Sequence, residues 1–545
     1  MKPANQSKDL FKGAFILTIA ALIIKILSAV YRIPFQNIVG DVGFYIYQQV
    51  YPFYGVAVVL ATTGFPVVIS KLFAELRGKG NFEGAQRLLV MSYIFLQLFG
   101  ILCFTILYAG ADRIALWMND PKLAILLKVV SIVFLMFPFI SVLRGYYQGS
   151  GNMVPTAVSQ VGEQVMRVST IILLSYLLVK KGYSLYLVGG GAMFGSITGS
   201  LVSAFILFTF LWIRKEWNMF TINRASIRKD LFESGWIFKA LFSQGLAICI
   251  SGMLMIFIQM ADSLNLYSLL VSSGIEKETA KGLKGIFDRG QPLIQLGTVV
   301  ATSMSLSLVP LITSERLKKK PALLHHKIQL AMKISFVIGV GATAGLAAII
   351  RPTNMMLFEN DLGSSMLGVL SIVIFFNTII STMVAILQGL GNMTFPAVII
   401  IAGLPIKYFL NQGLVPRFGT MGAAVASVIT LALICIIVTV KFKKIVMRPI
   451  YSFRFFKTVL FASLLMVLIV KVVLFATSFL HILTESSRLF AAIQSITAVF
   501  IGGVVFMGIV IRGNVFQEED IKLIPFGNKL ALFLRHEDRS GNSRE

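Results

Sequence analysis

The chain alternates between long apolar stretches and short polar connections. A membrane-spanning helix needs about 20 consecutive, mostly apolar residues, and windows of that kind recur along the whole sequence. The pattern therefore predicts an all-α polytopic membrane protein with fourteen transmembrane helices. The predicted spans are residues 13–35, 45–69, 89–110, 123–146, 155–179, 185–213, 238–268, 285–312, 328–350, 365–387, 395–413, 419–440, 457–478 and 490–511.

Composition and charge agree with a membrane protein. Hydrophobic residues make up 57% of the 545 residues and charged residues only 13%, whereas about a quarter of a soluble protein is charged. The formal net charge is +25. In a soluble chain this charge would suggest nucleic acid, but in a membrane protein Lys and Arg accumulate in cytoplasmic loops.

The basic residues fall in alternate loops. If the amino terminus is cytoplasmic, the second, sixth, eighth and twelfth loops are cytoplasmic too, and the odd-numbered loops contain few cations. This asymmetry predicts two cytoplasmic termini and explains most of the charge without nucleic acid. The cations of the even loops are Lys71, Arg77, Lys79, Arg87; Arg214, Lys215, Arg224, Arg228, Lys229; Arg316, Lys318, Lys319, Lys320, Lys327; and Lys441, Lys443, Lys444, Arg448, Arg454, Lys457.

The chain repeats part of itself. "QGSGNM" at 148–153 recurs as "QGLGNM" at 388–393, each time where the fourth span of a half meets the fifth. The repeat predicts two pseudo-symmetric six-helix lobes in parallel orientation, followed by two extra helices. The expected segments are an N-terminal lobe (1–213), a basic cytoplasmic linker (214–236), a C-terminal lobe (237–444), the last two helices (445–511) and a cytoplasmic tail (512–545).

Each hexapeptide is interpreted as a cytoplasmic hinge rather than a binding loop. Glycine permits a tight reversal, and asparagine caps or turns it. The six hinge residues are Gly149, Gly151, Asn152, Gly389, Gly391 and Asn392. In the sixth span, Gly191, Gly195 and Gly199 form a GxxxGxxxG pattern, which indicates close helix packing.

A few charged residues lie within the predicted spans, where charge is costly and faces a cavity or a partner. Even if every anion is paired, positive charge remains, so the site favours an anionic substrate. The planar fork of Arg suits phosphate, which indicates an amphiphile with a phosphate or pyrophosphate head group. The candidate substrate-binding residues are Lys25, Arg32, Glu163, Arg167, Asp288, Arg289 and Lys407; Asp262 is a candidate for an ion site or a structural pair.

The same charges have structural explanations, which the sequence leaves open. Glu163 and Arg167 are one helical turn apart and can neutralise each other. Asp262 and Lys407 can form another pair. Interfacial positions would explain the rest: opposite interfaces for Lys25 and Arg32, the membrane surface for Asp288 and Arg289, and an anchor role for Arg144 beside the first hexapeptide.

No catalytic or metal-binding pattern accompanies these charges. Cys103, Cys249 and Cys435 lie in apolar runs without CxxC spacing. The "GGGAMFG" stretch at 189–195 lacks the Lys-Ser/Thr of a phosphate-binding loop. We therefore expect no enzyme activity, no cofactor and no metal.

Three segments carry a resemblance to a known family. Residues 11–40, 61–75 and 144–168 resemble the stage V sporulation protein B-like polysaccharide transporters. These belong to the multidrug/oligosaccharidyl-lipid/polysaccharide flippase superfamily, together with the lipid II flippases and the multidrug extruders. The resemblance implies two lobes in a V shape around a central cavity, with alternating access.

The resemblance also implies roles for particular residues. "FDRGQPLIQLGTVVATSMSLSLVPLI" (287–312) resembles the eighth-helix signature of the lipid II flippases, which implies a substrate role for Asp288 and Arg289. Lys25 falls where that branch has a first-helix arginine. The second arginine in the first helix of that branch corresponds in position to Tyr31, and Arg32 follows one residue later. The arginine that the branch has in its second helix has no counterpart in "YPFYGVAV" (51–58).

Some relatives bind a sodium ion between the seventh and eleventh helices. Asp262 lies near the matching place, but Lys407 on the eleventh span would compete with a cation. We therefore expect no sodium site.

Together these observations predict a flippase in the bacterial cytoplasmic membrane. Its substrate would be an undecaprenyl-pyrophosphate-linked sugar, either lipid II or another polysaccharide or cell-wall precursor, moved by alternating access. One competing hypothesis is a multidrug exporter, which the positive surplus disfavours because such exporters take organic cations. A second is a non-transporting scaffold that recruits wall-synthesis enzymes. The expected partners are the lipid-linked sugar and membrane lipids, with wall-synthesis enzymes as further candidates; we expect a monomer and no nucleic acid.

Overall fold

The computed structural model describes residues 3–220, 234–299, 321–446, 451–479, 487–513 and 515–516. All regular elements in these ranges are helices, and twelve helical segments within them are long and apolar enough to cross a membrane. The expected all-α polytopic fold is confirmed. Residues 300–320 of the eighth predicted span and its loop, residues 221–233 of the basic linker and most of the tail lie outside the described residues.

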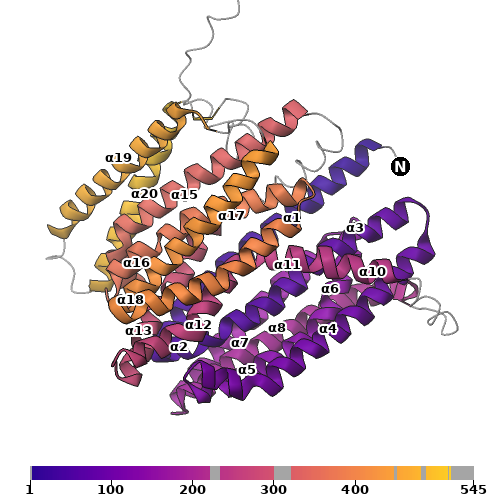
Figure 1. Cartoon of the computed structure of the whole chain (residues 1–545), viewed down its shortest axis with the longest axis horizontal. Coiled ribbons are helices and arrows are strands. Elements are labelled where there is room, and N and C mark those ends of the chain that lie inside the picture. The colour runs from indigo at the N-terminus through magenta and orange to yellow at the C-terminus, as the bar shows by residue number, and fades with distance from the viewer. Residues whose placement is uncertain are drawn as a thin grey trace, which may run out of the picture.

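Two groups of helices form two lobes that diverge from one end of the molecule (Figure 1). The two C-terminal helices pack against the second lobe through α15. The N-terminal lobe contains α1 (Pro3–Val30), α2 (Arg32–Val59), η1 (Leu60–Gly64), α3 (Phe65–Gly78), α4 (Phe82–Trp117), η2 (Pro121–Leu123), α5 (Ala124–Ser131), α6 (Val133–Gly149), α7 (Val154–Lys180), α8 (Leu185–Ile213) and η3 (Glu216–Phe220). The C-terminal lobe contains α10 (Gly235–Ala240), η5 (Leu241–Gly245), α11 (Leu246–Gly252), α12 (Leu254–Ser272), α13 (Lys277–Asp288), α15 (Pro321–Phe358), α16 (Ser364–Leu370), α17 (Ile372–Gly389) and α18 (Thr394–Val446), and is followed by α19 (Phe453–Ser478) and α20 (Ser487–Arg512).

Two of the continuous helical segments contain a reversal. Gly40 inside α2 has φ 69° and Gly419 inside α18 has φ 58°, a left-handed conformation that glycine adopts without a Cβ penalty. Each segment therefore holds two of the predicted spans. The seventh predicted span is instead broken at Met253, between α11 and α12. With these features the twelve segments account for thirteen of the fourteen predicted spans, and the remaining one is the eighth, which the structure describes only as far as residue 299.

The two hexapeptides adopt the same turn. Gly151 donates to the carbonyl of Gln148, and Asn152 donates to that of Tyr147; the second copy repeats both bonds from Gly391 and Asn392. The two glycines have φ 81° and 84°. This pair of bonds is the Schellman motif that ends a helix at a left-handed glycine. The duplicated sequence therefore encodes the same helix end in both lobes, while its role as a hinge stays a prediction.

Glycines bring α8 close to α7. A Cβ added to Gly195 would lie 2.9 Å from the carbonyl oxygen of Arg167, and one added to Gly199 would lie 2.8 Å from that of Glu163. A side chain at either position would push the helices apart. The expected close packing of the sixth span is thus confirmed at the two α7 positions that carry charge.

Polar contacts fasten the C-terminal helices to α15. Pro352 lacks an N–H, so the carbonyl of Ala348 one turn earlier loses its helical donor. Lys471 of α19 donates to this carbonyl at 3.1 Å. Arg488 of α20 donates to the carbonyl of Met356 at 3.0 Å and pairs with Glu359. The C-terminal end of α15 is therefore held by side chains from both C-terminal helices.

Candidate functional site

Two arginines lie among tyrosines inside the N-terminal lobe. Arg32 and Arg167 are 2% and 3% exposed. The Arg32 guanidinium lies over the ring of Tyr51 at 4.3 Å, and that of Arg167 over Tyr54 at 4.9 Å. Both also lie within 6 Å of the Tyr31 ring, at 5.9 and 5.5 Å. The shared ring joins two cations from different helices into one arginine–tyrosine cluster.

The cluster has spare hydrogen-bonding capacity. Arg167 donates from Nη2 to Gln164 at 2.7 Å, but its Nε and Nη1 have no hydrogen-bond partner, and neither does Nε of Arg32. No carboxylate forms an ion pair with Arg32 or Arg167 within the described residues. Buried donors without partners are rare because they cost free energy. The arrangement is therefore suited to receive an anion, since phosphate oxygens accept from the planar fork of arginine.

Gln295 connects this cluster to the C-terminal lobe. Its carboxamide oxygen accepts from Nη1 of Arg32 at 3.3 Å, and its nitrogen donates to the backbone carbonyl of Lys25 at 3.4 Å. Lys25 is half-buried. The eighth predicted span thus reaches the two charged positions of the first span.

Arg289 is held by a different set of residues. Its Nε and Nη2 donate to both carboxylate oxygens of Asp41 at 2.6–2.9 Å, and Nη1 donates to Asn360 at 2.7 Å. Its guanidinium also lies over Phe358 at 5.2 Å. Because Asp41 belongs to α2 and Asn360 follows α15, this interlobe lock joins the two lobes where they meet.

The interlobe lock depends on a small residue. A Cβ on Gly285 would clash with the carbonyl oxygen of Asp41. Asp288, beside Arg289, is paired with Lys284, which donates to both of its oxygens at 2.6 and 2.7 Å. Asp288 and Arg289 are 4% and 0% exposed. The structure therefore places them inside the bundle rather than at the membrane surface.

The expected pairing of Glu163 with Arg167 is wrong. Glu163 instead forms an ion pair with Nη2 of Arg144 at 2.8 Å. The expected interfacial position of Arg144 is also wrong, because this side chain is fully buried. It also donates to Ser203 at 2.8 Å and to the carbonyl of Ala61 at 3.3 Å. A spacing of one helical turn makes two residues neighbours on the helix surface, but here an arginine from α6 forms the ion pair with the carboxylate.

Asp262 and Lys407 form the expected structural pair. Nζ of Lys407 lies 3.1 Å from the Asp262 carboxylate, and the two side chains are 2% and 0% exposed. Asn411 donates to the same carboxylate oxygen at 2.9 Å. Because the ammonium already neutralises this carboxylate in a buried place, the residues present do not fit a bound sodium.

The lobes also touch away from the interlobe lock. The π-helical turn η1 of the N-terminal lobe packs against α11 of the C-terminal lobe. A Cβ on Gly64 would collide with Cys249, and one on Gly245 would lie 2.8 Å from the ring of Phe65. These glycines allow the two lobes to approach closely at this contact.

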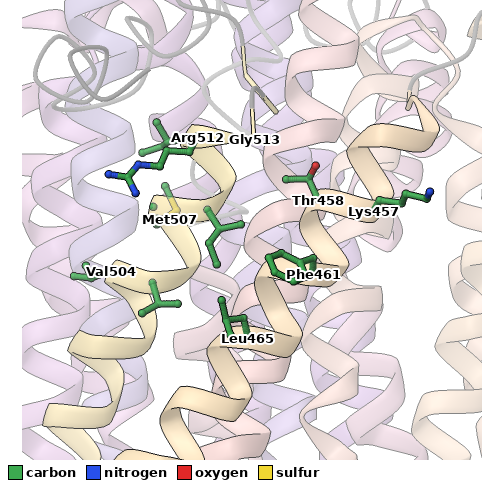
Figure 2. A pocket seen from close by; sticks show the side chains of 12 residues that line it. Lys457, Thr458, Phe461, Leu465, Val504, Met507, Arg512 and Gly513 are labelled. Carbon is green, nitrogen blue, oxygen red and sulfur yellow. The ribbon is translucent and has the colours of Figure 1, made fainter. Parts of the chain in front are cut away.

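A separate groove lies between α19 and α20. It has a volume of about 930 Å³ and apolar walls, including Phe461, Leu465 and Val504. Figure 2 shows Lys457 and Arg512 toward one end and Leu465 and Val504 farther along. Phe461 is 60% exposed, so the groove faces the surroundings of the bundle and is separate from the cluster.

The tyrosines of the site were not among the residues predicted from the sequence. Tyr47, Tyr51 and Tyr54 follow at i, i+4 and i+7, the spacing of one helix face. The hydroxyls of Tyr31 and Tyr47 are hydrogen-bonded at 2.8 Å. The uncharged stretch 51–58 therefore supplies aromatic partners for two arginines. The helical spacing of the tyrosines was visible in the sequence. Their contact with Arg167 was not, because Arg167 comes from another helix.

The fold and these intramembrane charges define a two-lobed polytopic membrane protein. The chain belongs to the polysaccharide biosynthesis protein family, whose model matches residues 10–316. It is 43% identical over 540 residues to the uncharacterized membrane protein YabM of Bacillus subtilis (strain 168), covering 98% of each chain.

Two further relatives from the same organism have more informative names. The chain is 26% identical over 527 residues to "Lipid II flippase MurJ", covering 92% of this chain and 95% of the relative. It is 26% identical over 443 residues to "Stage V sporulation protein B", covering 78% and 82%. The expected family is confirmed.

A solved structure shares the fold. "Lipid II flippase MurJ, inward closed conformation" aligns with a TM-score of 0.61 at 16% identity, covering 92% of this chain and all of the other. Identity this low supports the fold alone, which extends over the two lobes and the C-terminal helices.

Proposed function

We propose that the chain is a flippase for an undecaprenyl-pyrophosphate-linked sugar and that the arginine–tyrosine cluster binds the pyrophosphate. The observation that carries this proposal is the pair of buried guanidiniums of Arg32 and Arg167, which have unpartnered nitrogens and no carboxylate within ion-pair distance in the described ranges. Arg289 and Lys407 are already neutralised. Arg32 and Arg167 therefore carry much of the surplus positive charge expected from the sequence, and both lie in the N-terminal lobe.

The charge of the cluster favours this substrate over an organic cation. A buried cationic site attracts a diphosphate and repels the cations that a multidrug exporter of this fold would carry. The name of one relative, a lipid II flippase, agrees with a lipid-linked substrate. The scaffold hypothesis has no comparable support among the described contacts.

Alternating access would use the contacts between lobes. The interlobe lock of Arg289 and Asp41 closes one end, while the contact between η1 and α11 rests on van der Waals packing around Gly64 and Gly245. Since packing without ion pairs separates at a lower cost than a buried ion pair, the η1–α11 side would open first. With the loop charges facing the cytoplasm, this side faces the cytosolic pool of substrate.

The remaining parts of the proposal follow from the topology. The chain would lie in the bacterial cytoplasmic membrane with both termini inside. It would act as a transporter rather than an enzyme, and as a monomer that contacts wall-synthesis enzymes through its basic loops. Moving a polar head group through hydrocarbon is costly, and a cavity with fixed cations lowers that cost for a phosphate.

The test is a single-turnover leaflet assay in proteoliposomes with a fluorescent undecaprenyl-pyrophosphate-linked sugar. Arg32→Gln and Arg167→Gln should each slow flipping by roughly tenfold to a hundredfold, because a hydrogen bond to a charged group contributes about 1.5–3 kcal/mol. Arg113→Gln, at an exposed arginine, is the matched control and should flip at the wild-type rate. Wild-type flipping by the Arg32→Gln/Arg167→Gln double variant would overturn the proposal.

A further inference from the structure

The ammonium of Lys407 lies in a cage of three oxygens. It donates to the carbonyl of Ala423 at 2.5 Å and to the hydroxyl of Ser427 at 2.7 Å, and it lies 3.1 Å from the carboxylate of Asp262. An ammonium has three protons, and here each has one acceptor. The cage is closed, because Lys407 and Asp262 are 0% and 2% exposed.

This geometry differs from that of a simple ion pair. In a simple pair the carboxylate is the nearest acceptor, whereas here the carboxylate contact is the longest of the three. The neutral carbonyl and hydroxyl oxygens therefore help to hold the ammonium, together with the carboxylate. A carbonyl, a hydroxyl and a carboxylate are also the donors with which proteins coordinate small hard cations.

Further oxygens nearby are unused. Oδ2 of Asp262 and Oδ1 of Asn411 have no hydrogen-bond partner. Asn411 is fixed by its nitrogen, which donates to Asp262 and Asn265 at 2.9 Å each. Asp262 lies on α12, and Asn411 lies on α18 one turn from Lys407, so both helices carry an oxygen without a partner on a residue next to the ammonium.

We propose that the Lys407 ammonium is a tethered cation that permanently fills a monovalent-cation site between α12 and α18. The chain therefore holds these helices together without a free inorganic cation, and its stability does not depend on sodium. Shortening the side chain exposes the site to solution cations. This proposal concerns the C-terminal lobe only and does not depend on which lipid the chain moves.

The test measures thermal unfolding of the full-length protein in detergent at equal concentrations of NaCl, LiCl, KCl and choline chloride, without lipid substrate. The wild type should unfold at the same temperature in all four. Lys407→Ser should unfold at a lower temperature in choline and regain roughly 2 °C or more in NaCl or LiCl, because a ligand that binds only the folded state raises its stability.

The matched control removes the carboxylate as well. Lys407→Ser/Asp262→Asn has no buried charge at this position, and its unfolding temperature should be the same in all four salts. A sodium-specific rise in the unfolding temperature of the wild type would overturn the proposal. So would a Lys407→Ser protein whose unfolding temperature is the same in all four salts. If Lys407→Ser does not fold, Lys407→Ala provides the same comparison, and the wild-type measurement alone can still contradict the proposal.

Discussion

Asp41 and Arg289 stand 248 positions apart in the sequence and meet in a two-pronged ion pair. Arg289 is fully buried, and Asp41 is 21% exposed. Because the first belongs to the N-terminal lobe and the second to the C-terminal lobe, their pairing fixes how the lobes meet.

Removing the carboxylate should loosen this contact. Asp41→Asn leaves a buried guanidinium with neutral partners, at a cost of about 3–5 kcal/mol. With spin labels at exposed Lys181 and Lys277, the distance distribution should broaden toward longer values relative to the parent protein. Glu278→Gln, which breaks the neighbouring ion pair of Lys281, should leave it unchanged. An unaltered distribution in Asp41→Asn would show that the pair does not hold the lobes together.

Substituting alanine for each of two glycines of α13 should change the stability in opposite directions. A methyl group on Gly285 meets the backbone of Asp41, whereas one on Gly282 meets nothing within 4 Å. Gly285→Ala should therefore lower the unfolding temperature and lengthen the same spin-label distance. Gly282→Ala should keep the distance and gain up to about 1 kcal/mol from helix propensity. Equal behaviour of the two variants would contradict the close approach of α13 to α2.

The contributions of the Tyr51 ring and of its hydroxyl can be measured separately. Its ring lies 4.3 Å from the Arg32 guanidinium, and such a contact contributes about 2 kcal/mol or more when desolvated. Tyr51→Phe keeps the ring and removes only the hydroxyl. It should therefore keep the thermal stability of the wild type but lower the flipping rate, since the substrate loses a hydrogen-bond partner. Tyr51→Leu should lower both, because Arg32 loses its aromatic partner. If the two variants flip and unfold alike, the ring contributes nothing.

Lys471 and Pro352 should be coupled in a double-mutant cycle. Lys471→Met leaves the buried carbonyl of Ala348 without a donor, at a cost of about 1–3 kcal/mol. Adding Pro352→Ala supplies an N–H four residues after Ala348 and should recover part of that stability. Chemical denaturation of the four proteins measures the coupling, and strictly additive effects would show that Lys471 does not replace the missing helical bond.

Much of the architecture could be predicted from the chain alone. The apolar windows defined the spans because a helix must satisfy its own backbone in lipid. The repeated Q-G-x-G-N-M stretch marked the same helix end twice because its hydrogen bonds are local. The reversals at Gly40 and Gly419 separate spans that the sequence already divided, whereas the break at Met253, inside the seventh predicted span, was not predicted.

The candidate site could be predicted only in part. Lys25, Arg32, Arg167, Arg289 and Lys407 were found because charge in a span is conspicuous. The pairing of Lys407 with Asp262 was predicted. The partner of Arg289 was not, since Asp41 lies outside the predicted spans, and neither was the pairing of Glu163 with Arg144, which was assigned to the interface. The tyrosines followed a helical period but looked like ordinary apolar packing.

The sequence by itself determined the class of the protein, its duplicated lobes and the sign of its intramembrane charge. These properties depend on composition, on short-range periodicity and on the cost of burying charge, all of which act along the chain. Only the tertiary structure decided which cations remain available. Arg289 is neutralised by Asp41 and Lys407 by Asp262, whereas Arg32 and Arg167 face tyrosine rings. Pairing depends on which helices meet in space, and that distance is not a function of separation in sequence.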